Sequence, residues 1–175
     1  MTTGMYLTVR LVLAVSLVAA QVLAHPQEIT PDELAGTYVF GFAFGSSTLR
    51  LKSDGVYSIE SSDCTTIYSE SGTYLLSGGV LRLKASKRTE REPGDDKEAD
   101  VLVGLEERRL VPVRWSYRMY LIYESDLESF AEAVERGVEP RSELTSMSNS
   151  YDGAFYLRRG DELKPVSGRP ALPAK

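Results

Sequence analysis

The chain has 175 residues, of which 26% are charged and 42% hydrophobic, and its formal net charge is −5 at pH 7. An acidic chain without a long basic stretch lacks the positive surface that attracts nucleic acids and anionic membranes, so neither is expected as a partner. The length suits one domain with its own hydrophobic core.

Residues 1–24 have the pattern of a secretory signal peptide. Arg10 supplies a short positive flank, residues 11–20 form an apolar run, and Val22 and Ala24 occupy the two positions that signal peptidase reads. The run is shorter than the roughly 20 residues that span a bilayer, so no membrane span is expected after cleavage. We therefore expect an exported protein, periplasmic or extracellular, that begins at His25. Its 151 residues carry a net charge of −6, because the leader holds one arginine and no acid.

His25 and Cys64 are the only residues of their types. Pro26 lacks the N–H that copper chelation beside His25 would need, and a terminal histidine leaves Ser-His-Asp and Cys-His mechanisms without a base. A lone thiol forms no internal disulfide, so Cys64 is either a small side chain on a strand or the site of an intermolecular bridge. We expect no enzymatic activity, no cofactor and no metal site.

The segment after the leader repeats one pattern twice. Gly-Thr-Tyr at 36–38 and 72–74 is followed by Leu-Arg-Leu-Lys at 49–52 and 81–84, where apolar and charged residues alternate as in a half-buried strand. Ser-Asp-Gly and Ser-Gly-Gly sequences between strands supply the positive φ angles of tight hairpins. An antiparallel meander is predicted after a helical turn at 31–35, with strands at residues 37–44, 47–52, 56–60, 65–69, 72–76 and 80–85.

Residues 86–100 interrupt this alternation. Ten of these fifteen residues are charged and Pro93-Gly94 lies at the centre, which predicts a long solvated hairpin loop. The spacing of its acids fits no calcium-binding loop. Pro112 cannot donate a ladder hydrogen bond, so its strand is expected at an edge or a bulge. Further strands are predicted at residues 101–105, 110–115 and 118–123.

A change of period at Ser125 predicts one amphipathic helix over 125–136. Ser125 and Glu128 have the spacing of a capping box, and Gly137 can end the helix. One apolar helix face is formed by Leu127, Phe130, Ala131 and Val134. A last strand is expected at 154–158. The predicted organisation is a single β-barrel-like domain over residues 25–163 and a Pro-containing tail over residues 164–175.

Residues 33–38, Glu-Leu-Ala-Gly-Thr-Tyr, resemble the opening of lipocalin-like (calycin) barrels, in which a short turn precedes a Gly-x-Trp strand. Tyr38 stands where that family has tryptophan. The resemblance implies an antiparallel meander closed into a small barrel, with a helix after the meander and one final strand. The stretch from Val113-Arg114-Trp115 to Gly160-Asp161 also looks like a group of uncharacterised exported bacterial proteins, which implies no function.

Two functions fit these patterns. The first is an exported, non-catalytic binding module that holds an unknown small molecule in the lumen or mouth of its barrel. The alternative is a structural or interaction protein of the cell envelope, with a barrel filled by side chains and an envelope protein as partner.

The candidate ligand patch comprises Arg114, Trp115, Tyr117 and Arg118. Two guanidinium groups beside the single tryptophan could bind an anion or a sugar by charge and stacking. In the competing interpretation Trp115 packs in the core and the arginines extend to water.

Overall fold

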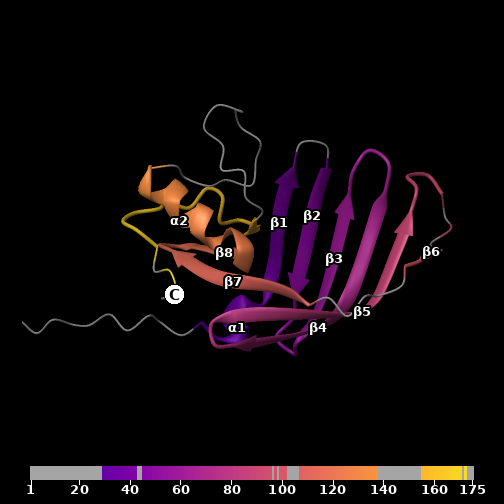
Figure 1. The fold of residues 1–175 in the computed structure, drawn as a ribbon, viewed down its shortest axis with the longest axis horizontal. Coiled ribbons are helices and arrows are strands. Elements are labelled where there is room, and N and C mark those ends of the chain that lie inside the picture. The colour runs from indigo at the N-terminus through magenta and orange to yellow at the C-terminus, as the bar shows by residue number, and fades with distance from the viewer. Residues whose placement is uncertain are drawn as a thin grey trace, which may run out of the picture.

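The structure is a computed structural model that describes residues 29–42, 45–95, 97, 99–101, 107–137, 155–170 and 172. Eight strands close into an antiparallel barrel, with a short two-stranded extension at β6 (Figure 1). The predicted mainly β architecture, with one helix near the C-terminal end, is confirmed. The strands are β1 (Gly36–Phe42), β2 (Gly45–Leu51), β3 (Val56–Ser62), β4 (Ile67–Ser77), β5 (Val80–Arg91), β6 (Ala99–Asp100), β7 (Arg108–Trp115), β8 (Arg118–Tyr123) and β9 (Phe155–Arg158).

The barrel closes through pairings between segments far apart in the sequence. β9 lies between β1 and β8, where Leu157 is opposite both Val39 and Tyr120. On the other side, β5 pairs along its length with β4 and over residues 81–83 with β7. Pro112 lies beyond the part of β7 that pairs with β5, so its missing N–H interrupts no ladder bond with that strand.

β4 and β5 are longer than the sequence pattern predicts. The strands expected at 65–69 and 72–76 are one strand, which a register shift between Ser71 and Gly72 divides. A Cβ at Gly72 would lie 2.1 Å from the carbonyl oxygen of Lys84, so only glycine allows the two backbones to approach this closely. The loop predicted at 86–100 is wrong for residues 86–91, which continue β5, and for residues 99–100, which form β6. The register shift hides this continuation, because it changes the alternation of inward and outward residues.

Two apolar clusters stabilise the fold, one inside the barrel and one on its outer face. The outer cluster lies between α2 and the strands β7, β8 and β9, and consists of Val111, Val113, Trp115, Tyr120, Ile122, Phe130, Phe155 and Leu157. The interior is filled mainly by leucine and tyrosine side chains: Leu34, Tyr38, Leu49, Leu51, Tyr57, Ile59, Tyr74, Leu81, Leu83, Leu110, Met119, Leu121 and Tyr156.

The helix α1 (Pro31–Leu34) covers one end of the barrel. Thr30 and Glu33 form a capping box, and the Tyr38 hydroxyl donates to the Leu34 carbonyl oxygen at 2.9 Å. The Leu34 side chain is fully buried in the interior cluster. The helical turn predicted at 31–35 is thus confirmed, and it closes this end of the barrel.

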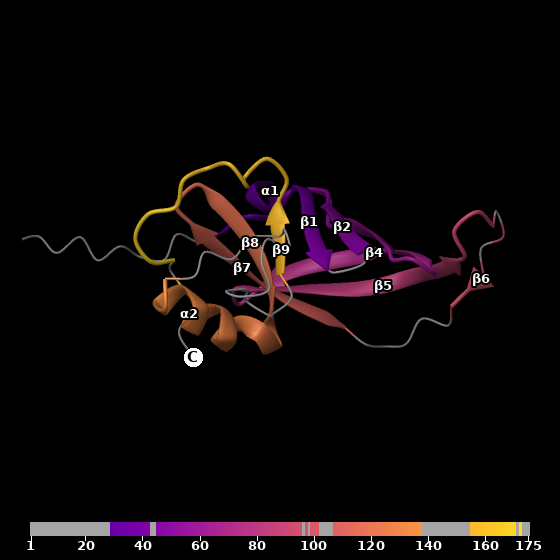
Figure 2. The same cartoon turned by 90° about the horizontal axis from the view of Figure 1, so that it is seen from above.

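The helix α2 (Leu127–Glu135) lies outside the barrel, beside β7 and β8 (Figure 2). It buries Phe130 and Ala133, whereas Leu127 and Val134 are partly buried against the same cluster. The predicted capping box is wrong. A 3₁₀ turn η1 (Glu124–Asp126) precedes the helix, and the Ser125 hydroxyl donates to the Asp126 carboxylate at 3.2 Å. The helix ends as predicted, with Gly137 at φ 79°.

The predicted tail lies partly against the β7–β8 hairpin. Ser167 and Ser116 exchange hydrogen bonds of 2.8 and 3.0 Å. Val166 and Leu172 pack against the outer cluster. These contacts hold the segment after β9 against the β7–β8 hairpin and the outer cluster.

Several predicted segments lie wholly or partly outside the described residues. They are the leader 1–24, His25, residues 43–44 of the first strand, residues 96 and 98 of the loop, Ala154, residues 171 and 173–175 of the tail, and the strand at 101–105 apart from Val101, which is in no strand. Within the described part of the chain, no helix has the length and apolar character needed to cross a membrane.

Candidate functional site

The structure separates Trp115 from the other three residues of the predicted patch. Trp115 is only 6% exposed, its Nε1 donates to the Gly168 carbonyl oxygen at 3.1 Å, and its ring lies in the outer cluster near Tyr120. Arg118 is 4% exposed, and its Nε donates to the Lys164 carbonyl oxygen at 2.6 Å. The indole therefore does not line a pocket with the two arginines.

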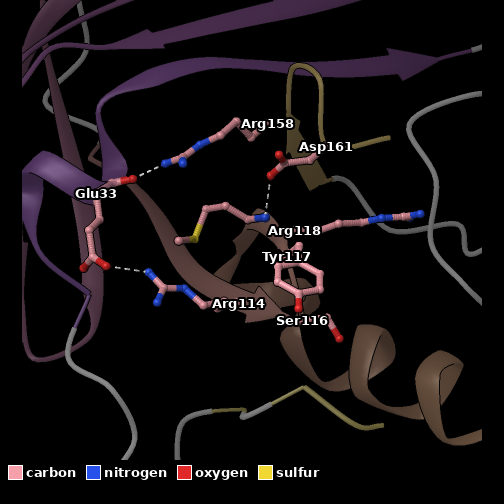
Figure 3. A pocket seen from close by; sticks show the side chains of 8 residues that line it. Glu33, Arg114, Ser116, Tyr117, Arg118, Arg158 and Asp161 are labelled. Atoms are coloured by element: carbon pink, nitrogen blue, oxygen red, sulfur yellow. Dashed lines mark hydrogen bonds and ion pairs between the residues drawn. The ribbon is translucent and has the colours of Figure 1, made fainter. Parts of the chain in front are cut away.

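Arg114, Tyr117 and Arg118 do line a pocket of about 300 Å³ at the α1 end of the barrel, called here the end pocket (Figure 3). Four elements meet around it: α1, the β7–β8 hairpin, the end of β9 and the turn that follows β9. In the close view Arg114 and Arg158 extend toward Glu33, whereas Arg118 points away from it. The remaining lining residues are Glu33, Ser116, Met119, Arg158 and Asp161.

Arg158 is the arginine of the end pocket that sequence reasoning missed. Its Nη2 donates to the Glu33 carbonyl oxygen and, at 3.0 Å, to the Tyr38 hydroxyl. Its guanidinium carbon lies 5.4 Å from the centroid of the Tyr38 ring, a cation–π distance. Among the described residues its Nε is buried without a hydrogen-bond partner. In the sequence, Arg158 and Arg159 are adjacent arginines at the end of a strand. Nothing in the sequence distinguishes the one that lines the pocket from the one that is exposed.

Two carboxylates share the end pocket. Glu33 pairs with Arg114 at 2.8 Å, and this hydrogen bond, together with those from Thr30, lowers the pKa of Glu33 to about 2. Asp161 is buried, accepts a 2.9 Å hydrogen bond from the Met119 amide, and pairs with Lys164. Both acids therefore have cationic partners of their own, and neither pairs with Arg158.

A second polar group lies inside the barrel around Glu70, and we call it the interior arginine cluster. Glu70 accepts hydrogen bonds from the hydroxyls of Tyr57 at 2.6 Å and Tyr68 at 2.5 Å. Arg88 Nε donates to Glu70 at 2.7 Å, and Arg108 donates through Nε at 3.3 Å and Nη2 at 3.1 Å. Strands β3, β4, β5 and β7 thus converge on one carboxylate.

The interior arginine cluster carries a surplus of positive charge. Burial alone would raise the pKa of Glu70, but hydrogen bonds from Tyr57, Tyr68 and Arg108 lower it to about 2, so the group is ionised. Burial and the neighbouring Glu70 raise the pKa of Tyr57 and of Tyr68, which keeps both phenols neutral. Two guanidinium groups therefore face one carboxylate.

The cluster and the end pocket are separate. Arg108 and Arg114 are six residues apart on β7, which corresponds to roughly 20 Å along a strand. Arg114 contacts α1, so the end pocket lies at the covered end and Arg108 lies toward the opposite end. Sequence reasoning missed the cluster because it placed Arg88 in a loop.

Comparisons with protein-family models, curated proteins and solved structures return no match for this chain. The closed eight-stranded barrel is consistent with the lipocalin-like resemblance at the level of the fold. Over the described ranges, no three His, Cys, Asp or Glu side chains gather as a metal site would require.

Proposed function

We propose that this chain is an exported, non-catalytic binding module that holds a small oxyanion at the interior arginine cluster. One observation carries the proposal: Arg88 and Arg108 both pair with Glu70, which leaves one positive charge without a negative counterpart in the cluster. The ligand class follows from the charge and from the hydrogen-bond donors that remain.

The charge balance favours an anion. Glu70 is 2% exposed and the Arg88 side chain is 15% exposed, so both groups have lost most of their water, whereas the Arg108 side chain is 32% exposed. A desolvated cation is costly unless an anion or several acceptors face it. A bound oxyanion would offset the surplus charge without disturbing the ion pairs with Glu70.

The unused donors favour an oxyanion in particular. Arg88 donates through Nε alone, and its two Nη groups have no hydrogen-bond partner among the described residues. Arg108 donates through Nε and Nη2, which leaves its Nη1 without a described partner. Guanidinium groups present paired N–H donors that match two oxygens of a carboxylate or phosphate.

Export and the lack of catalysis rest on the sequence. Residues 1–24 have the pattern of a cleaved leader, which supports a periplasmic or extracellular location. With one histidine at the expected terminus and one cysteine, Ser-His-Asp and Cys-His mechanisms lack their base. These features support a protein that binds its ligand without converting it.

The alternative is a structural or interaction protein of the cell envelope. The filled interior favours it, because Tyr38, Leu49, Tyr57, Leu81 and Leu83 are almost completely buried there. In that case the two arginines serve only to neutralise Glu70 and hold four strands together, and the cluster binds no external anion.

Titration calorimetry with inorganic phosphate tests the proposal, with sodium chloride at matched ionic strength as the reference. We expect saturable binding to the wild type and at least about tenfold weaker binding to Arg88→Gln, since a hydrogen bond to a charged group contributes about 1.5–3 kcal/mol. Arg82→Gln is the matched control, because Arg82 lies on the same strand but pairs with Glu107 at the surface.

Two results would overturn the proposal: no phosphate binding beyond the chloride reference, or unchanged binding by a folded Arg88→Gln variant. If that variant does not fold, Arg88→Lys keeps the charge and removes the paired donors, so it should bind phosphate more weakly than the wild type. The first result would leave the filled-barrel alternative as the better account.

A further inference from the structure

The end pocket contains an arginine without a carboxylate partner. Arg158 uses Nη2 for the Glu33 carbonyl oxygen and the Tyr38 hydroxyl, and it forms no ion pair among the described residues. Its Nη1 likewise has no described hydrogen-bond partner. Arg114, in contrast, is neutralised by Glu33 at 2.8 Å. Within this pocket the guanidinium of Arg158 is therefore the group suited to an external anion.

An exposed aromatic ring lines the same pocket. Tyr117 is 73% exposed at the tip of the β7–β8 hairpin, whereas Met119, which also borders the pocket, is only 3% exposed. A tyrosine at such a position offers an apolar ring for contact and a hydroxyl for hydrogen bonding. The pocket thus combines the guanidinium of Arg158 with the exposed ring of Tyr117.

The hairpin tip is fixed before any ligand arrives. Ser116 has φ 54°, a conformation that non-glycine residues seldom adopt, and its hydroxyl donates to the Ser167 carbonyl oxygen at 3.0 Å. The Ser167 amide donates back to the same hydroxyl at 2.8 Å. A fixed tip presents the Tyr117 backbone without an ordering cost, which favours binding.

We propose that the end pocket binds a small carboxylate with a flat apolar body, its carboxylate on Arg158 and its body against the ring of Tyr117. The pocket volume of about 300 Å³ limits the ligand to one small molecule, because it lies at the lower end of the range for ligand sites. This site is independent of the interior arginine cluster and of the function proposed for it.

Benzoate is a suitable probe, and benzyl alcohol is its uncharged counterpart. Titration followed by amide chemical shifts should show benzoate binding to the wild type, with the largest shifts at residues around 116–119 and 158–161. Arg158→Gln should weaken binding at least about tenfold through loss of the charged hydrogen bonds. Tyr117→Ala should weaken it about two- to tenfold through loss of the aromatic contact, and the exposed position makes folding of this variant secure.

Arg159→Gln is the matched control, because Arg159 is the exposed neighbour of Arg158 and does not line the pocket. Benzoate should bind Arg159→Gln as it binds the wild type, whatever the outcome of the phosphate experiment. Three results would overturn the proposal. The first is no benzoate binding, and the second is benzyl alcohol binding as tight as benzoate. The third is wild-type benzoate affinity in both Tyr117→Ala and a folded Arg158→Gln. Loss of benzoate binding in Arg88→Gln alone would instead place benzoate at the interior cluster.

Discussion

Glu70 is a carboxylate inside a barrel that is otherwise mainly apolar, and five hydrogen bonds from four side chains hold it ionised. Removing this buried carboxylate, or one of its hydrogen-bond partners, leaves the remaining groups of the cluster buried without a partner, which destabilises the fold. Its pKa of about 2 in the folded protein lies well below its ordinary value of 4.5. The stability of the fold must therefore depend on pH through this residue.

A carboxylate whose pKa is lower in the folded state than in the unfolded state stabilises the fold at pH values above its unfolded-state pKa. This stabilisation is lost as the pH falls toward the folded-state pKa. We expect the free energy of unfolding to decrease between about pH 4.5 and pH 2, with Glu70 contributing on the order of 3 kcal/mol. Urea unfolding at a series of pH values checks this. Glu70→Gln should be less stable at pH 6 and should show a smaller decrease toward acid.

Glu33 provides the control for this prediction. Its pKa is also about 2, but its ion pair with Arg114 is at the surface, where solvent screens the interaction. Glu33→Gln should therefore keep most of the acid sensitivity of the wild type. An unchanged pH profile in Glu70→Gln would show that the interior cluster does not govern acid stability.

At the scale of elements, α2 is attached to the barrel through one face, which packs against the outer cluster. Phe130 is fully buried, with its ring centroid 5.5 Å from that of Tyr120 and 6.2 Å from that of Phe155. Glu132 lies on the exposed side of the same helix. The helix is short, so its stability comes from this packing more than from its own hydrogen bonds.

Phe130→Ala should lower the free energy of unfolding by about 3–5 kcal/mol, because it leaves a cavity between α2 and the sheet. Glu132→Ala, on the exposed side, should change it by less than about 0.5 kcal/mol. Chemical denaturation of both variants gives the comparison. Equal effects would mean that α2 does not pack through Phe130.

Much of the element order could be predicted from the sequence, because alternation, turn glycines and the helical period are local signals. Residues 86–91 could not be assigned, since their charged composition is typical of a loop while Arg88 is directed inward to Glu70. Ala133 was also missed: it is fully buried, whereas Ala131, the alanine predicted on the apolar face, is only partly buried.

For the site, the sequence identified the β7–β8 hairpin but not the partners that complete its pocket. Alternation places Arg114 and Trp115 on opposite faces of β7, and hence in different environments. Arg158 and Asp161 come from a distant segment that reaches Arg114 only when β9 inserts between β1 and β8. Such pairings depend on barrel closure, which no local pattern encodes.

At the scale of the whole molecule, the barrel has two chemically different ends. Helix α1 and the residues after β9 surround the end pocket, and the interior arginine cluster lies toward the opposite end. Both proposed sites use arginine, although the chain as a whole has a net charge of −5. We therefore expect small anions as ligands in preference to polyanions such as nucleic acids, which bind to extended basic patches.

The last prediction concerns export of the protein. The apolar run at 11–20 is too short for a stable span, so the leader should be removed after Ala24. Intact-mass measurement of protein recovered from its own host should give a chain that begins at His25. A variant with Leu13 and Val15 both changed to Arg should remain unprocessed inside the cell, since a charged core cannot act as a signal. A membrane-retained wild-type species that still carries Met1 would contradict the prediction.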